Sequence, residues 1–237
     1  MTLSPPPYSN EYVASLFPKG TSSNINKYWP LICRWLDEYD ASTDEKLVIY
    51  TLATIRAETY PLFSPAAERP SKYTLLKHDG QVREFGQYEL PGKKLGNHRA
   101  PDQMEQMLRA RHGVAPLVDD NDGFNFRGRG FVQLTGRWNY TDMQRRLEPY
   151  IPGLNILEEP DKVSDPEIAA HIIAVWVAKL KREKILHAMQ SKDYKLARKA
   201  VNVGALNMEA FMEVIHAHKR NALLFDHFLA KKNQRIA

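Results

Sequence analysis

Apolar residues recur at helical spacing along much of the chain, whereas the alternation that indicates strands is weak. The clearest case is a stripe of positions three and four residues apart, which share one face of a helix: Leu47, Val48, Thr51, Leu52 and Ile55. Just before it, Ser42-Thr43-Asp44-Glu45 has the spacing of a capping box, in which a serine caps the helix. The pattern predicts a helix that begins at this box.

A second capping box, Ser164-Asp165-Pro166-Glu167, opens an apolar run over residues 168–180. Because this run is apolar nearly all round, we expect a helix in the centre of the protein. Further helices are predicted over residues 101–111, 139–147, 194–201 and 208–230. Residues 61–98 instead carry scattered glycine and proline with little periodicity, which is typical of long loops or a small irregular hairpin.

These elements predict a mainly α protein. The chain has 237 residues, of which 43% are apolar and 26% charged, and this suits one globular domain with a sizeable core. We expect residues 1–22, which include a run of three prolines, to form an extended N-terminal segment. Residues 23–237 then form the domain, which can have two lobes.

The first twenty residues have neither a basic region nor a continuous apolar stretch, so they do not resemble a secretory signal. No apolar run approaches the roughly 18–20 residues that span a bilayer. We therefore expect a soluble protein without an integral membrane segment, synthesised in the cytoplasm. If its substrate is the cell wall, release through a pore or a secretion machinery has to carry it to the periplasm. Delivery machinery, or an immunity protein, is then an expected partner.

The net charge of +5 is unevenly placed. Between Lys179 and Ala237 there are thirteen Lys and Arg against five Asp and Glu, an excess of eight positive charges. Such a surface attracts polyanions, which leaves nucleic acid, anionic lipid and the acidic polymers of a bacterial wall open as partners. A simple solvated helical surface is the alternative.

The single cysteine, Cys33, lies in an apolar and aromatic stretch, which favours a buried packing thiol over a nucleophile and excludes an internal disulfide. His216 and His218 are two residues apart and so fall on different faces of a helix, and no Cys/His cluster accompanies them. The sequence therefore predicts no metal site, and it contains no cofactor motif.

Glu58 lies three residues after Ile55 and seven after Thr51, so it prolongs the apolar stripe of its helix. A carboxyl there is partly desolvated, which raises its pKa and leaves a proton for general acid catalysis. The alternative is a glutamate at a helix end that turns back to water or pairs with Arg56. Ten residues later, Glu68 stands on a predicted loop. Two carboxylates on separate elements are the minimum for glycoside hydrolysis.

An unusual motif occupies residues 126–140, with the sequence FRGRGFVQLTGRWNY. Its three glycines allow tight turns and a close approach of ligand, and Gln, Thr and Asn recur among aromatic residues. This mixture suits a sugar site, where amides and hydroxyls bind ring substituents and aromatic faces pack against the ring. The Arg-Gly-Arg-Gly run lacks a phosphate-loop pattern and is too short and too apolar for a disordered RNA-binding tract, so we expect no nucleic acid.

The segment from Arg127 to Tyr140 resembles the Gly-Arg-Gly-x-x-Gln-Leu-Thr-Gly-x-x-Asn-Tyr signature of family-19 chitinases and of the related phage and bacterial endolysins. Supporting matches follow the family's order over residues 47–220: Ala57-Glu58-Thr59, Ser71-Lys72-Tyr73, Leu95-Gly96-Asn97 and Val201-Asn202-Val203-Gly204. The chain departs from the family at Ala57, where histidine is common, and in a loop of endolysin rather than plant length. The resemblance implies a lysozyme-like, bilobal helical domain.

The resemblance also implies an inverting mechanism. Glu58 matches the family's proton donor, Glu68 the base that activates water, and Thr135 the hydroxyl that holds this water; the short loop also leaves Ser71 or Thr74 open for that last role. Residues matching substrate contacts are Gln133, Asn139, Tyr140, Asn202 and Tyr73, with Arg220 added as the partner of Glu209 in the family's supporting charge pair.

We therefore expect a bacteriolytic glycosidase that cleaves β-1,4 bonds between N-acetyl sugars, used in cell lysis or as an antibacterial effector. The absence of disulfides, the basic C-terminal third and the short loop favour bacterial peptidoglycan over chitin as the substrate. The alternatives are a chitinase, a lytic transglycosylase, which would need Glu58 but no water-activating base, and a non-catalytic glycan-binding protein.

Overall fold

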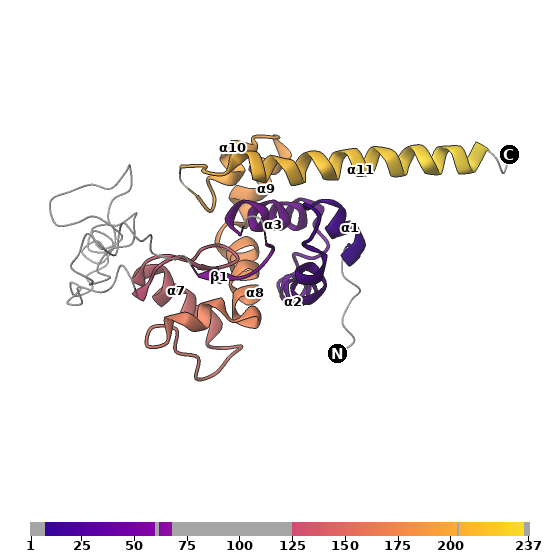
Figure 1. Ribbon diagram of the computed structural model, residues 1–237. Coiled ribbons are helices and arrows are strands. Elements are labelled where there is room, and N and C mark those ends of the chain that lie inside the picture. Colours follow the sequence, from indigo (N-terminus) through magenta and orange to yellow (C-terminus); the bar gives the residue numbers. More distant parts are fainter. Residues whose placement is uncertain (1–7, 60–61, 68–124, 203, 235–237) are drawn as a thin grey trace, which may run out of the picture. The chain divides into compact units, whose positions relative to one another are not determined.

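The computed structural model describes residues 8–59, 62–67, 125–202 and 204–234, with side chains up to residue 222. The chain divides into two compact units, one formed by Met1–Ser64 with Ile173–Ala237 and the other by Pro65–Ile172. The described residues are mainly helical and hold one sheet of two short strands (Figure 1), so the predicted mainly α class is confirmed. The boundary expected at residue 22 falls inside the first unit.

Helices build the first unit. In chain order they are α1 (Asn10–Ser15), α2 (Ser22–Glu38), α3 (Glu45–Glu58), a π-helical turn (Trp176–Leu180), α9 (Arg182–Gln190), α10 (Tyr194–Arg198) and α11 (Met208–Gln234). The predictions over 194–201 and 208–230 are confirmed as α10 and α11, although α10 ends earlier and α11 continues further. The predicted helix over 101–111 lies outside the described residues.

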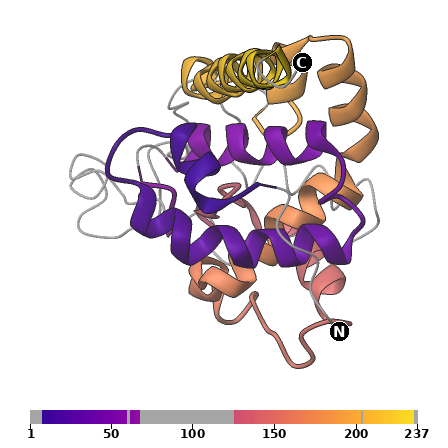
Figure 2. The same ribbon diagram turned by 90° about the vertical axis from the view of Figure 1, so that its right-hand side faces the viewer.

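α3 is the centre of the first unit. All eleven residues from Leu47 to Ala57 are buried, and the helix lies between α2 and α11 (Figure 2). α9 packs against it as well. The sequence indicated one apolar stripe, but the helix is covered on every side because Ile49, Ala53 and Thr54 are buried too.

α2 and α9 were not predicted. The proline at position 30 obscured α2, because proline in a helix interior removes a backbone hydrogen bond and normally ends the helix. Here the helix continues through Pro30, and its buried face, which includes Trp29, Ile32 and Leu36, outweighs that cost. Cys33 lies on this helix and is 7% exposed, and burial raises the pKa of its thiol. The predicted packing thiol is confirmed.

Both predicted capping boxes use a different cap. Asp44 is the N-cap of α3 and accepts hydrogen bonds from the backbone of Lys46 and Leu47, whereas Ser42 donates to Asp37. The helix α8 (Pro166–Val175) follows Asp165, which accepts from the first turn of that helix. In each case an aspartate nearer to the first turn replaces the serine, because both residue types cap well and the helix starts later than the box implies.

The predicted apolar helix over 168–180 is present but not uniform. α8 ends at Val175, and a π-helical turn continues to Leu180. The indole Nε1 of Trp176 donates to the carbonyl oxygen of Ala200, 3.3 Å away. The division between the two units falls within α8, after Ile172.

The second unit contains β1 (Ala66–Ala67), β2 (Arg129–Gly130), α7 (Arg137–Leu147) and a 3-10 helix, η1 (Pro160–Ser164). The strands pair antiparallel, with Ala66 opposite Gly130. They come from distant parts of the sequence, so this sheet is not a local hairpin within residues 61–98. The helix predicted over 139–147 is confirmed as α7.

Residues 1–22 were expected to be extended, but residues 10–15 form α1. Ser9 caps this helix and Val13 is fully buried. The indole of Trp29 donates to the carbonyl oxygen of Tyr8, which joins the segment to α2. The sequence prediction was wrong here because α1 is only six residues long and is held by tertiary contacts rather than by its own periodicity.

Tyr8 and Tyr12, at the start of the described chain, make polar contacts with α3 and α11. The hydroxyl of Tyr12 lies 2.7 Å from Nδ1 of His218, and Nε2 of His218 lies 3.5 Å from Glu45. The hydroxyl of Tyr8 donates to the same carboxylate at 2.8 Å, and the rings of Tyr8 and Tyr12 stack. Burial lowers the pKa of His218 below its ordinary 6.5, with a smaller contribution from Lys219, although Glu45 acts in the opposite direction.

No described helix is long and apolar enough to cross a membrane. Among the described residues no group of three or more His, Cys, Asp or Glu side chains is placed to hold a metal ion.

Because the pKa of His218 is lower in the folded protein than in the unfolded chain, protonation favours unfolding. We expect the free energy of unfolding to fall as the pH drops from about 7.5 to about 5.5, and the substitution His218→Gln to remove part of this loss. Urea denaturation at both pH values measures it. His216→Gln, an exposed position on the same helix, is the matched control. An unchanged pH dependence in His218→Gln would contradict the assignment.

Candidate active site

Glu58 is the last residue of α3, and its side chain is only 10% exposed. Its Oε1 lies 2.6 Å from Nη2 of Arg198, whose side chain is fully buried. The two groups form a buried ion pair. Arg56, the alternative partner considered from the sequence, donates to Glu213.

Arg198 reaches Glu58 from the end of α10. Its Nε donates to the carbonyl oxygen of Leu206 at 2.9 Å, which fixes the plane of the guanidinium. The loop that follows is tight: the side-chain oxygen of Asn202 accepts from the backbone of Leu206, and Ala205 and Asn207 have positive φ. This loop therefore positions the cation that faces Glu58.

Two opposing effects act on the pKa of Glu58. Burial raises it, because a desolvated carboxylate is less stable than the neutral acid. The charge and contact of Arg198 lower it, but burial is the larger effect, so the pKa of Glu58 stands above the ordinary value of 4.5. The desolvation inferred from the sequence is therefore present, and its effect is partly offset by a cation that the sequence did not reveal.

A pocket of about 450 Å³ opens in front of Glu58. It lies wholly within the first unit, and its lining residues are Ala57, Glu58, Asn207, Glu209, Ala210 and Glu213. The side-chain amide of Asn207 donates to the carbonyl oxygen of Ala57 at 2.9 Å, and this contact joins the loop before α11 to the end of α3. A small ligand in this pocket would meet a buried carboxyl with a raised pKa.

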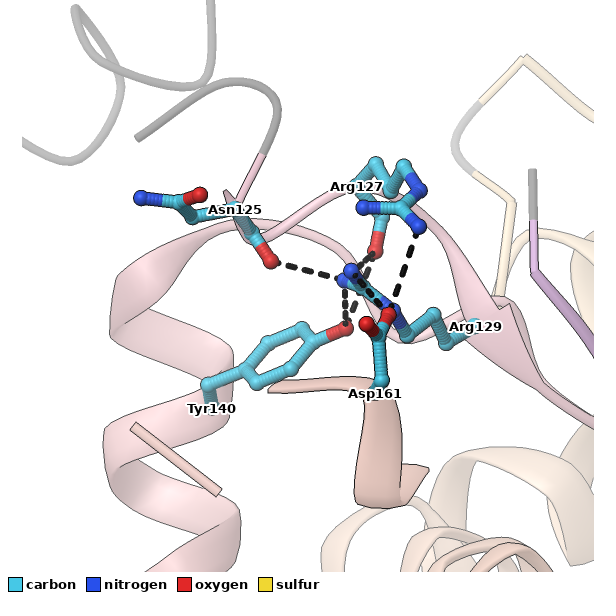
Figure 3. A network of polar contacts seen from close by, with 5 residues as sticks. All are labelled: Asn125, Arg127, Arg129, Tyr140 and Asp161. Carbon is cyan, nitrogen blue, oxygen red and sulfur yellow. Dashed lines mark hydrogen bonds and ion pairs between the residues drawn. The ribbon is translucent and has the colours of Figure 1, made fainter. Parts of the chain in front are cut away.

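The glycine-rich motif lies in the second unit, where Arg129 organises it (Figure 3). The guanidinium of Arg129 is almost completely buried and donates to the carbonyl oxygens of Asn125 and Arg127 and to the hydroxyl of Tyr140. Its Nη2 also lies 2.7 Å from Asp161. One side chain thereby ties together the start of the motif, α7 and η1.

The middle of the motif is a tight reversal. The backbones of Arg129 and Leu134 exchange two hydrogen bonds, and between them Gln133 adopts a φ of 50°, which is uncommon outside glycine. Gly130 has a φ of +77°, and a side chain there would lie 3.0 Å from the carbonyl oxygen of Val163. This position therefore requires glycine, for backbone conformation and for space.

The polar residues of the motif make local hydrogen bonds with their donor groups. The amide of Gln133 donates to the carbonyl oxygens of Ala66 and Gly130, the hydroxyl of Thr135 donates to the carbonyl oxygen of Gln133, and the amide of Asn139 donates to that of Thr135. All three residues are partly exposed. Their oxygen atoms still have lone pairs for a donor from a ligand or from water.

The structure corrects two residue assignments. Tyr140 was expected to contact a sugar, but it is fully buried and its hydroxyl donates to the carbonyl oxygen of Arg127, so its role is to support the motif. Arg220 was expected to pair with Glu209; Arg220 is exposed on α11, and the charges beside Glu58 and Glu213 are Arg198 and Arg56 instead. Both errors arose because sequence order does not reveal which side of an element is covered.

The remaining candidates are divided by position. Glu58 and Asn202 belong to the first unit, and Gln133, Thr135 and Asn139 belong to the second. The side-chain oxygen of Asn202 is used within its own loop. Glu68 and Tyr73, as well as Ser71 and Thr74, lie outside the described residues, so their predicted roles remain predictions.

Three functional or supporting residues were missed: Arg198, Asn207 and Arg129. Arg198 stands four residues after Tyr194 and next to the buried Ala197, so helical periodicity could have indicated a buried arginine. Arg129 was noted only as part of an Arg-Gly-Arg-Gly run. No pattern in the sequence indicated Asn207, because its contact with Ala57 joins two residues that are far apart in the chain.

No protein-family model matches this chain, and no curated protein sequence matches it either.

The hydroxyl of Tyr140 both donates to the carbonyl oxygen of Arg127 and accepts from Arg129, so Tyr140→Phe removes two hydrogen bonds from a buried network. We expect this substitution to lower the free energy of unfolding by about 1–3 kcal/mol. Tyr194→Phe is the control, because the ring of Tyr194 packs under Lys219 but its hydroxyl makes no hydrogen bond in the described structure. Equal stability of the two variants in chemical denaturation would show that the network does not stabilise the motif.

Arg198 opposes the effect of burial on Glu58, so its removal should raise the pKa of Glu58 further. We expect the carboxyl carbon of Glu58, followed by NMR, to titrate at a higher pH in Arg198→Met than in the wild type. Arg220→Met removes one exposed positive charge from the same unit and should leave the titration unchanged. A lower or unaltered pKa in a folded Arg198→Met would refute the ion pair.

Proposed function

We propose that this protein is a glycoside hydrolase that cleaves β-1,4 bonds between N-acetyl sugars, with bacterial peptidoglycan as its substrate. The observation that carries the proposal is Glu58, a carboxyl with a raised pKa that is nine-tenths buried and lines a pocket of about 450 Å³. A group of this kind is suited to general acid catalysis, because it retains its proton at a higher pH than an exposed glutamate.

In the proposed reaction Glu58 donates its proton to the glycosidic oxygen as the bond to the sugar breaks. The resulting carboxylate is then stabilised by Arg198, which lies 2.6 Å away and is already buried beside it. Burial favours the acid form of Glu58 and the guanidinium favours the anion, and burial is the larger of these two effects.

An inverting reaction needs a second carboxylate that activates water on the opposite face of the sugar, roughly 6.5–9.5 Å from the acid. We assign this role to Glu68 by the family resemblance, with Thr135 holding the water. The hydroxyl of Thr135 already donates to the backbone of Gln133, so its oxygen can accept a hydrogen bond from that water.

Two features of the chain support a glycan substrate. Gln133 and Asn139 use their amide groups to brace the motif, and their carbonyl oxygens can accept from sugar hydroxyls. The basic segment from Lys179 to Ala237 favours a polyanionic polymer such as the bacterial wall over neutral chitin.

The substitution Glu58→Gln tests the proposal, since glutamine keeps the shape of the side chain but has no acidic proton. We expect clearing of a peptidoglycan gel to fall by about 100-fold or more, while thermal unfolding shows a folded protein. Glu183→Gln makes the same chemical change at an exposed position of α9 and should retain wild-type clearing.

Mass spectrometry of the products from purified sacculi identifies the bond and the mechanism. Reducing ends formed by addition of water agree with the proposal, whereas 1,6-anhydro ends would indicate a lytic transglycosylase. A wild-type protein that binds sacculi without cleaving them would contradict the enzymatic function altogether.

A further inference from the structure

Two adjacent residues of the loop before α11 hold the two sides of the ion pair between Glu58 and Arg198. The carbonyl oxygen of Leu206 accepts from Nε of Arg198 at 2.9 Å. The side-chain amide of Asn207 donates to the carbonyl oxygen of Ala57, also at 2.9 Å, and Ala57 directly precedes Glu58. The same short stretch of backbone therefore links the position of the cation to that of the carboxyl.

The carbonyl of Ala57 needs a donor from outside its own helix. α3 ends at Glu58, so Ala57 belongs to its last turn, and the last four carbonyl groups of an α-helix have no partner within the helix. The amide of Asn207 supplies that donor. Because the contact is made one residue before Glu58, it fixes the backbone from which the carboxyl extends.

Asn207 is itself held firmly against α3. Its carbonyl oxygen accepts from the backbone of Phe211 at 3.1 Å, in the first turn of α11. Phe211 is fully buried, and its ring packs edge-on against that of Tyr50 on α3, with the ring centroids 5.8 Å apart. Asn207 has a φ of 57°, which asparagine adopts more readily than most residues. The packing of α11 on α3 thus places the amide.

We propose that Asn207 is a positioning residue of this site, whose amide holds the end of α3 so that the carboxyl of Glu58 stays against Arg198. The role rests on the proposed function, in which Glu58 gives its proton to the glycosidic oxygen. The carboxylate that remains is stabilised by the guanidinium only while the two groups are in contact. A displaced end of α3 therefore slows the proton transfer, although substrate still binds.

Asn207→Gly tests the proposal, because glycine adopts a positive φ without strain and the substitution removes the amide. A looser pair weakens the effect of Arg198, which lowers the pKa of Glu58, while burial still raises it. We expect the carboxyl carbon of Glu58, followed by NMR, to titrate at a higher pH than in the wild type. A lower or unaltered pKa in the folded variant would overturn the proposal.

Ala205→Gly is the matched control. It places glycine at another residue of the same loop with a positive φ, 52°, and leaves the contact between Asn207 and Ala57 in place. The titration of Glu58 should match that of the wild type. Equal shifts in both glycine variants would show that the stiffness of the loop matters and that the amide of Asn207 has no role of its own.

A double-mutant cycle separates positioning from general support of α3. If Asn207 acts through the ion pair, Asn207→Gly should cause no further rise of the Glu58 pKa in protein that already carries Arg198→Met. The same shift in both backgrounds would mean that the amide only supports the helix, and the positioning role would be wrong.

Steady-state cleavage of soluble, uncrosslinked peptidoglycan chains gives a second readout. We expect kcat of Asn207→Gly to fall about tenfold and KM to stay within about twofold of the wild type, because the contact acts on the reacting carboxyl and not on binding. Ala205→Gly should retain both constants. A raised KM with an unchanged kcat would place Asn207 in substrate binding instead and contradict the proposal.

Failure of this proposal can be told apart from failure of the proposed function. A wild type that cleaves peptidoglycan, together with an Asn207→Gly variant of unaltered kcat and unaltered Glu58 titration, would overturn only the role of Asn207. A wild type that cleaves no glycan would overturn the hydrolase and with it the catalytic role of Asn207, whereas the NMR titration would still report whether Asn207 holds Glu58 against Arg198.

Discussion

The burial of α3 on every side is the constraint on which the first unit depends. A helix that is covered on every side, with α9 and α11 packed against it, cannot send its polar groups to water, so each charge near its end needs a partner from another element. Arg56 finds Glu213 on α11, and Glu58 finds Arg198 on α10. These pairs hold the end of α3 in place. The same packing buries Glu58, and this burial raises its pKa although Arg198 acts in the opposite direction.

In the second unit, Arg129 is the residue that provides partners for buried polar groups. A planar guanidinium with five donors can satisfy two backbone carbonyls, a phenol and a carboxylate at once, which lysine cannot. The reversal from Gly130 to Leu134 is braced by this residue and by the amide of Gln133. The unusual backbone at Gln133 is thus supported by the hydrogen bonds of its own amide and by those between the backbones of Arg129 and Leu134.

Many of the helices could be predicted from the sequence, because the spacing of apolar residues indicates long helices such as α3 and α11. The errors fell where a tertiary contact decided the outcome. α1 is too short to show periodicity, α2 continues through Pro30, and the caps of α3 and α8 shifted to Asp44 and Asp165. In each case local preference alone did not decide the structure.

The sequence by itself determined that Glu58 lies on the apolar stripe of its helix, since this place follows from helical geometry alone. Whether the side chain is buried there or turns back to water was left open. It also indicated tight turns and many hydrogen-bonding groups within residues 126–140, of which the turns lie before α7 begins at Arg137. Only the tertiary structure decided which cation faces Glu58 and that Tyr140 supports the motif from within. Those outcomes depend on contacts between residues distant in the chain, and the spacing along one helix carries no information about what packs against it.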